Sequence, residues 1–371
     1  MPDPFQIADR MKTMDSSGIR KVFDLAAKLK DPVNLSIGQP DFDVPEAAKD
    51  EAIAAIRRGF NKYTQTQGTA ELRQAVADAC RAEFGWDDDR PYLITSGVSG
   101  ALLLAFLTCV NPGDEVILLD PYFVMYKHLT NLVGGKPVVV DTYPDFAPHP
   151  DKIAAAVSAR TRLIVINSPC NPTGRVYTAD ELAAIAEIAR KHRLLVISDE
   201  IYNLFCYDQP FASMASFHDD TLLMRGFSKT YAMTGWRMGW CTGPRAIIEK
   251  MTMLQQYSFV CAPSMAQLAA VVAMTIDMSA RRDEYRRKRD MVFAALGGPF
   301  GLVRPGGAFY AFVPAPKGLT GTRFVEKAIA HNVLVIPGHV FSEKDTHFRI
   351  AYPTSDEKLR QGLDILVKLA K

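Results

Sequence analysis

The stretch Leu194-Leu-Val-Ile-Ser-Asp199 is an uninterrupted apolar run that ends in a serine and an acid. A short apolar run without alternation is typical of a strand that is buried on both faces of a sheet. Just before it, residues 179–192 carry apolar side chains at helical spacing, and Thr178 with Glu181 forms the sequence pattern of a capping box. An amphipathic helix followed by a buried strand predicts a parallel α/β sheet.

The same alternation continues on both sides of this stretch. We expect further strands at 92–95, 115–119, 137–140, 162–167, 222–224 and 238–242, and helices between them at 101–110 and 122–133. Alternation over about 150 residues predicts an α/β fold whose mostly parallel central sheet is covered by helices on both faces. A smaller set of elements from residue 301 onward, with strands at 308–312, 333–336 and 348–351, indicates a smaller α+β domain.

Other helices are expected outside this core. Their patterns fall at 19–29, 45–59, 70–83, 244–253 and 263–292. Within the last of these, residues 281–289 are heavily charged, and we interpret this run as a solvated helix face.

Composition narrows the classes of function. The 371 residues are 48% hydrophobic, which is enough for a large core and two domains. Lys plus Arg is 43 against 41 for Asp plus Glu, without a long block of like charge, so neither nucleic acid nor a membrane surface is an expected partner. The six cysteines show no zinc-type spacing, and no signal-peptide or membrane-spanning run is present. We expect a cytoplasmic protein without a metal site that acts on small molecules.

A second stretch, residues 225–240, carries the chemistry. Lys229 lies there among glycines and large apolar side chains, and partial desolvation would lower its pKa, leaving a neutral amine that can condense with an aldehyde. Arg237, a little further along, can hold an anion as a planar fork. Pyridoxal phosphate carries both an aldehyde and a phosphate. The alternative is a glycine-rich buried turn that holds a lysine with a buried stem.

Polar residues follow several of the expected strands. Asp199 with Glu200, the segment 167–174, the segment 120–123 and the Ser228-Lys229 pair each stand just past a strand end. In a parallel sheet these ends meet at one edge, where ligands bind. The turn 96–100, Ser-Gly-Val-Ser-Gly, joins a strand to a helix and is a candidate phosphate site.

Three side chains at this edge suit a pyridine ring. Asp199 can keep the ring nitrogen protonated, although it can also be a helix cap or a loop aspartate. Asn171 and Tyr202 can donate to a ring oxygen, although Asn171-Pro-Thr-Gly is also ordinary turn chemistry. Phe123 can stack on a flat ring, or it can belong to the core.

Four motifs in order resemble a known family. They read Ser168-Pro-Cys-Asn-Pro-Thr-Gly, Ser198-Asp-Glu-Ile-Tyr, Ser228-Lys-Thr-Tyr-Ala-Met-Thr-Gly-Trp-Arg and Phe348-Arg-Ile-Ala-Tyr-Pro-Thr-Ser. Together they are similar to the class I/II aminotransferases, pyridoxal phosphate enzymes with the aspartate aminotransferase fold. The resemblance extends over essentially the whole chain. It implies an N-terminal segment at 1–42 that packs with the small domain, a large cofactor-binding domain at 43–275 and a small C-terminal domain at 276–371.

The resemblance also implies a role for each matching residue. Lys229 would bind the cofactor aldehyde and move a proton between carbon atoms, with Asp199, Asn171 and Tyr202 on the ring and Phe123 stacked on it. The remaining residues would hold the phosphate, namely Val98, Ser99, Ser228 and Arg237, or the substrate α-carboxylate, namely Arg349 aided by Gly38 and Asn171. Tyr63 would reach the phosphate of a neighbouring subunit, which implies a homodimer.

Amino transfer between an L-α-amino acid and a 2-oxo acid by a ping-pong route is therefore the expected activity. Some relatives place a lysine that helps to hold a dicarboxylate side chain where this chain has Ser99. The donor is accordingly left open between aspartate, aromatic and neutral amino acids. A pyridoxal phosphate lyase or decarboxylase on the same scaffold is the alternative, and a cofactor-binding regulator without turnover is a more remote one.

Overall fold

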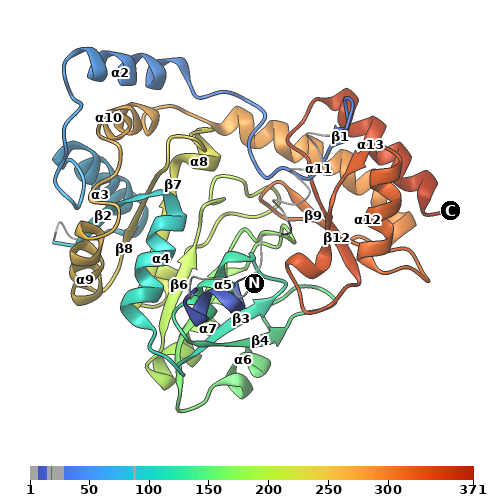
Figure 1. Cartoon of the computed structure of the whole chain (residues 1–371), viewed down its shortest axis with the longest axis horizontal. Helices are drawn as coiled ribbons and strands as arrows, with labels where there is room; N and C mark the ends of the chain where they lie inside the picture. Colours follow the sequence, from blue (N-terminus) through green and yellow to red (C-terminus); the bar gives the residue numbers. More distant parts are fainter. Residues whose placement is uncertain (1–6, 15–17, 19–28, 87–88) are drawn as a thin grey trace, which may run out of the picture.

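A computed structural model of the chain describes residues 7–14, 18, 29–86 and 89–371. The large sheet and its helices occupy one side of the molecule, and the C-terminal elements gather at the other, with the long helix α11 running between them (Figure 1). No helix in these residues is both long and apolar enough to cross a membrane. The helix expected at 19–29 lies outside the described residues, apart from residue 29.

The central sheet is mostly parallel, as predicted. Within the described residues seven strands follow the order β2-β8-β7-β6-β5-β3-β4, and only β8 runs antiparallel to its neighbours. Their bounds are β2 (Tyr92–Ser96), β3 (Glu115–Asp120), β4 (Lys136–Asp141), β5 (Thr161–Asn167), β6 (Leu195–Asp199), β7 (Thr221–Gly226) and β8 (Met238–Thr242). The carboxyl ends of β5, β6 and β7 therefore lie side by side.

Helices cover both faces of this sheet. Leu102 on α4 packs in a core cluster with Ile197 of β6, whereas Ile185 on α7 packs in another with Val196, the preceding residue of the same strand. Successive strand residues point to opposite faces, so an all-apolar strand needs cover on both. The helices of this part are α2 (Glu46–Arg57), α3 (Ala70–Phe84), α4 (Gly97–Cys109), α5 (Met125–Leu132), α6 (Pro150–Ala156), α7 (Ala179–His192), α8 (Phe227–Thr230), α9 (Arg245–Gln256) and α10 (Ser264–Ala273).

The C-terminal part is built around a smaller, antiparallel sheet. Its strand order is β11-β12-β9, and a separate parallel pair joins β1 near the start of the chain to β10. The elements are β1 (Val33–Asn34), α11 (Ser279–Phe300), β9 (Tyr310–Pro314), α12 (Gly321–Ala330), β10 (Val333–Leu334), β11 (Ile336–Pro337), β12 (His347–Ala351) and α13 (Asp356–Leu369), with the 3-10 turn η3 (Gly338–Val340). Two other 3-10 turns pack with the large sheet: η1 (Asp9–Thr13) contacts α5, and η2 (Met214–Ser216) contacts β7 and α7.

Local signals were accurate at some boundaries and wrong at others. The capping box is confirmed: Thr178 Oγ1 accepts from the Glu181 N–H at 3.2 Å, and Glu181 accepts from the Thr178 N–H at 2.8 Å. The single helix predicted at 263–292 is wrong, because α10 and α11 are separate helices. Asp277 accepts hydrogen bonds from the backbone and side chain of Ser279, and this local turn competes with a continuous helix.

The tertiary structure also shifts two elements. The helix predicted from residue 122 begins only at Met125, and the Tyr122 N–H before it donates to the Phe341 carbonyl at 2.8 Å, which ties this segment to η3. The strand predicted at 308–312 lies at Tyr310–Pro314, and Ala308 before it has a positive φ of 53° that is incompatible with a strand.

The charged run 281–289 is not simply a solvated face, so that interpretation is wrong for part of the helix. Lys288 and Arg289 are 2% and 0% exposed, and they form ion pairs with Asp41 and Asp208 respectively. Because α11 lies between the two halves of the molecule, a face of it that carries charges is buried against carboxylates from distant segments.

Candidate active site

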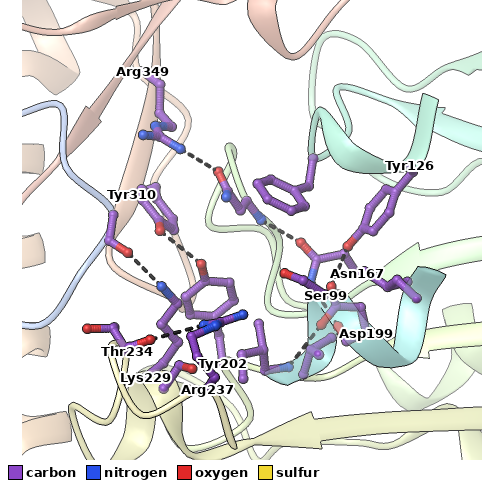
Figure 2. A pocket seen from close by; sticks show the side chains of 17 residues that line it. Ser99, Tyr126, Asn167, Asp199, Tyr202, Lys229, Thr234, Arg237, Tyr310 and Arg349 are labelled. Atoms are coloured by element: carbon purple, nitrogen blue, oxygen red, sulfur yellow. Dashed lines mark hydrogen bonds between the residues drawn. The ribbon is translucent and has the colours of Figure 1, made fainter. Parts of the chain in front are cut away.

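A pocket of about 290 Å³ lies where the carboxyl ends of β5 and β6 meet α4, α8 and β12 (Figure 2). Every site residue predicted from the sequence lines it, except Tyr63: Gly38, Val98, Ser99, Phe123, Asn171, Asp199, Tyr202, Ser228, Lys229, Arg237 and Arg349. The pocket is also lined by residues that were not predicted, notably Tyr126, Asn167, Thr234 and Tyr310. The fold thus gathers segments separated by more than three hundred positions in the sequence, as Gly38 and Arg349 are.

Lys229 stands on the short helix α8, directly after β7. Its Nζ donates to the Gly38 carbonyl at 2.6 Å. Burial, together with the positive charges of Arg349 and Arg237, lowers the pKa of Lys229 to about 8, with Asp199 acting in the opposite direction. At pH 7 about a tenth of this amine is therefore neutral, far more than for an ordinary lysine, and the neutral form is the nucleophile.

Asp199 ends β6 and is 4% exposed. Its carboxylate accepts from the Tyr126 hydroxyl at 2.7 Å and from the Ile201 N–H at 3.3 Å. Burial raises the pKa of Asp199 to about 6, although the hydrogen bond from Tyr126 lowers it. Such a carboxyl would be stabilised by a cation placed in the pocket. Tyr126 was missed because only the helical geometry of α5 turns it toward β6.

A chain of polar side chains leads from Asp199 toward the small sheet. Asn167 Nδ2 donates to the Asp199 carbonyl at 2.8 Å, and its Oδ1 accepts from the Asn171 N–H at 2.8 Å. The hydroxyls of Tyr202 and Tyr310 lie 2.8 Å apart. Tyr310 comes from β9, so no local sequence signal connected it to the site. Asn171 and Tyr202 are thus held in place before any ligand binds.

The N-terminus of α4 forms an anion cradle. Gly97, its first residue, has a φ of +66°, and the side chain of Ser96 makes no capping hydrogen bond, so the first N–H groups are available. A Cβ atom on Gly97 would lie 2.7 Å from Nη2 of Arg237, and one on Gly239 would lie 2.6 Å from the Gly97 carbonyl carbon. Only glycine lets these backbones and the guanidinium approach one another. The cradle fits a phosphate group.

Arg349 on β12 is 1% exposed. Its Nη1 donates to Asn171 Oδ1 at 2.9 Å and its Nη2 to the Ser36 carbonyl at 2.7 Å, with the rings of Tyr310 and Phe341 each 4.6 Å away. The buried Nε of Arg349 has no hydrogen-bond partner within the described residues. Burial lowers the pKa of the Arg349 guanidinium. A buried guanidinium with an unsatisfied donor fits a carboxylate ligand.

Two further predicted residues are Phe123, which lines the pocket, and Tyr63, which does not. Phe123 lines the pocket with its ring nearly perpendicular to that of Tyr126, at an interplanar angle of 79°. Tyr63 is 84% exposed and does not line this pocket.

Comparison with known proteins decides the family. The model of the family "Aminotransferase class I and II" matches residues 30–366. The chain is a class I/II aminotransferase. The enzyme is 38% identical to aromatic-amino-acid aminotransferase 2 of Thermococcus litoralis and 38% identical to an aspartate aminotransferase of Pyrococcus abyssi, in each case over 98% of both chains.

Comparison with solved structures supports the same family. The aminotransferase superimposes on the aspartate aminotransferase of Thermus thermophilus with maleate at a TM-score of 0.94, with 35% identity, covering 98% of this chain and 100% of that one. The resemblance and the fold class predicted from the sequence are confirmed. The enzyme transfers amino groups between amino acids and 2-oxo acids, and the names of its relatives cover both aspartate and aromatic donors.

Proposed function

We propose that this aminotransferase holds pyridoxal 5′-phosphate in the pocket through Lys229 and Asp199. One observation carries the proposal. The Lys229 amine, whose pKa is lowered, and the buried Asp199 carboxyl, whose pKa is raised, line the same cavity as the anion cradle at the N-terminus of α4. When bound, the cofactor supplies an aldehyde that takes up the amino group and a ring that withdraws electrons.

The chain's own residues then have defined tasks. Asp199 keeps a proton on the ring nitrogen, and Tyr126 holds that carboxylate in place. Asn171 and Tyr202 donate to the ring oxygen, and Phe123 covers the ring. The phosphate binds to the first turn of α4 at Val98 and Ser99, and to Ser228 and Arg237. The Lys229 amine would act as the base that takes the proton from the substrate Cα and as the acid that then donates it to the carbon receiving the amino group.

Substrate binding rests on Arg349. Its free Nε and its planar fork suit the α-carboxylate that every amino acid and 2-oxo acid carries. Gly38 lets the backbone lie close to the Tyr310 hydroxyl, because a Cβ at this position would clash with that hydroxyl. The pocket thus recognises the part common to both substrates, as a ping-pong enzyme needs.

Spectroscopy of Lys229→Ala tests the cofactor assignment. The wild-type protein should show the absorbance band of the lysine-bound cofactor, and addition of an amino acid without an oxo acid should convert it to the band of the amine form. Lys229→Ala should show neither the bound band nor turnover, whereas Lys327→Ala, at an exposed lysine on α12, should retain both. A lysine-bound band that persists in Lys229→Ala would refute the assignment.

We further propose a homodimer in which Tyr63 reaches the phosphate of the neighbouring subunit. Its 84% exposure in one chain supports this arrangement. Hybrid dimers test it: mixing Tyr63→Ala and Lys229→Ala subunits should yield one dimer site that lacks both residues and one intact site, so activity should reappear. If mixing restores nothing, or if the protein sediments as a monomer, the shared site is wrong.

A further inference from the structure

The segment 36–41, here called the strap, lies beside the pocket, which its Gly38 lines. Its Ser36 carbonyl accepts from Arg349 Nη2 at 2.7 Å, and its Gly38 carbonyl accepts from Lys229 Nζ at 2.6 Å. Figure 2 shows both cations, with Lys229 pointing to the strap. The position of this backbone therefore affects both the substrate-binding guanidinium and the reactive amine.

The beginning of the strap is fixed to the small sheet. The Leu35 N–H donates to the Leu334 carbonyl at 2.9 Å, and the Leu35 carbonyl accepts from the Ala351 N–H at 2.7 Å. The side chain and N–H of Ser36 both donate to Asn34 Oδ1. At this end, ordinary backbone pairing holds the chain.

The other end is fixed by side chains of α11. Asp41 Oδ1 accepts from the Tyr285 hydroxyl at 2.8 Å, and the Asp41 N–H donates to the same hydroxyl at 3.2 Å. Asp41 Oδ2 pairs with Lys288 Nζ at 2.5 Å, and Lys288 also pairs with Glu284 at 3.1 Å. Tyr285 and Lys288 are 0% and 2% exposed, whereas Asp41 is exposed, so water reaches the carboxylate but not its two partners.

An ion pair between a buried lysine and an exposed aspartate contributes little net stability, because desolvation of the lysine and solvent screening of the carboxylate offset the attraction. What it does provide is a fixed geometry. Asp41 is both charged and bound through its own backbone, so its position is defined by two groups on one helix. The strap therefore moves with α11 and the small sheet, and it presents its carbonyls to the pocket from that side.

We propose that Asp41, held by Tyr285 and Lys288, is a positioning residue that sets the strap and thereby orients Arg349 toward the substrate carboxylate. The inference rests on the proposed role of Arg349. Because the α-carboxylate is common to both substrates, loosening the strap should weaken the amino acid and the 2-oxo acid alike. The chemical step should change less than binding.

The test uses Tyr285→Phe, which deletes one hydroxyl and keeps the buried ring. We expect KM for the amino acid and for the oxo acid to rise together by about fivefold, with kcat within about twofold. Calorimetry with 3-phenylpropionate, an unreactive carboxylic acid, should show a matching loss of affinity. Tyr92→Phe, at a buried tyrosine of a different core cluster, should leave these values unchanged.

A double-mutant cycle separates positioning from a general loss of structure. In an Arg349→Lys background the effect of Tyr285→Phe on KM should disappear, because the fork that the strap orients is gone. An equal effect in both backgrounds, or a lower melting temperature with unchanged KM, overturns the proposal. If Tyr285→Phe does not fold, Asp41→Asn is taken through the same cycle with the same criteria. If Arg349→Lys alone leaves KM unchanged, the role of Arg349 itself is refuted instead.

Discussion

The hydroxyl of Tyr126 donates to Oδ2 of Asp199 at 2.7 Å, deep in the pocket. This hydrogen bond stabilises the charged form of a carboxyl whose burial favours the neutral form. The donor comes from α5 and the acceptor from β6, seventy-three positions apart. The contact therefore lowers the pKa of Asp199, the carboxyl proposed to pair with the ring nitrogen of the cofactor.

Tyr126→Phe should therefore weaken cofactor binding. Loss of the hydrogen bond raises the pKa of Asp199 further, so less of the charged form is available to pair with a ring cation. We expect the dissociation constant of pyridoxal phosphate to rise about tenfold, since a hydrogen bond to a charged group contributes about 1.5 kcal/mol or more. Fluorescence titration of the cofactor-free protein measures it. Tyr177→Phe, at a buried tyrosine packed on the opposite face of the sheet, serves as the control, and an equal loss there would contradict the prediction.

The free energy of unfolding of the cofactor-free protein should depend on pH through the titration of Asp199. The pKa of Asp199 is about 6 in the folded state, against the ordinary aspartate value of 3.8 in the unfolded chain, so between these pH values the folded state binds more protons than the unfolded state. The free energy of unfolding therefore falls as pH rises from about 4 to about 6, by up to about 3 kcal/mol from this group.

Asp199→Asn should abolish that contribution. Urea unfolding at pH 4.5 and pH 7 should show the variant gaining stability over the wild type on going to the higher pH. Asp120, whose pKa burial also raises to about 6, is present in both proteins, so the difference reports Asp199. A difference between the two proteins that does not change with pH would show that Asp199 is not buried in the manner described.

Behind Asp199 lies a buried charge network that should be structural. Arg225 donates to Glu200 at 2.8 Å and 3.0 Å and also pairs with Glu83, and Glu200 is 1% exposed. Arg225→Met leaves Glu200 without its cation, which should cost about 3–5 kcal/mol of unfolding free energy. Arg282→Met, at a more exposed arginine on α11, should cost less than about 1 kcal/mol. Equal stabilities of the two variants in urea would contradict this prediction.

The preferred amino-acid donor should depend on whether the pocket has a cation available for a second carboxylate. Among the described residues that line it, the cations are Lys229, Arg237 and Arg349, and each is assigned to the cofactor or to the α-carboxylate. We expect phenylalanine or a neutral amino acid to react faster than aspartate in the half-reaction. Ser99→Lys should raise kcat/KM for aspartate relative to phenylalanine by about tenfold, because a cation at the pocket wall offers a partner to the second carboxylate. Ser99→Met provides a control of similar length, and a matching rise with it would exclude a charge effect.

Local patterns in the sequence were sufficient for the sheet and for much of the pocket. Apolar runs such as residues 194–197 are long enough to identify buried strands, and parallel strands must bring their carboxyl ends to one edge. That rule alone placed Asp199, Asn171 and Lys229 near one another. The boundaries that failed, at residues 122 and 308, were set by contacts with distant backbone or by a positive φ.

The sequence by itself determined the α/β class and the family and predicted which residues line the pocket, because these depend on hydrophobic period and on motifs that are contiguous in the chain. Tertiary structure alone decided the partners: Tyr126 for Asp199, Tyr310 for Tyr202, and the buried Lys288 for Asp41. Each of these pairs joins elements far apart in the chain, and the burial that shifts a pKa or hides a charge exists only once those elements have packed together.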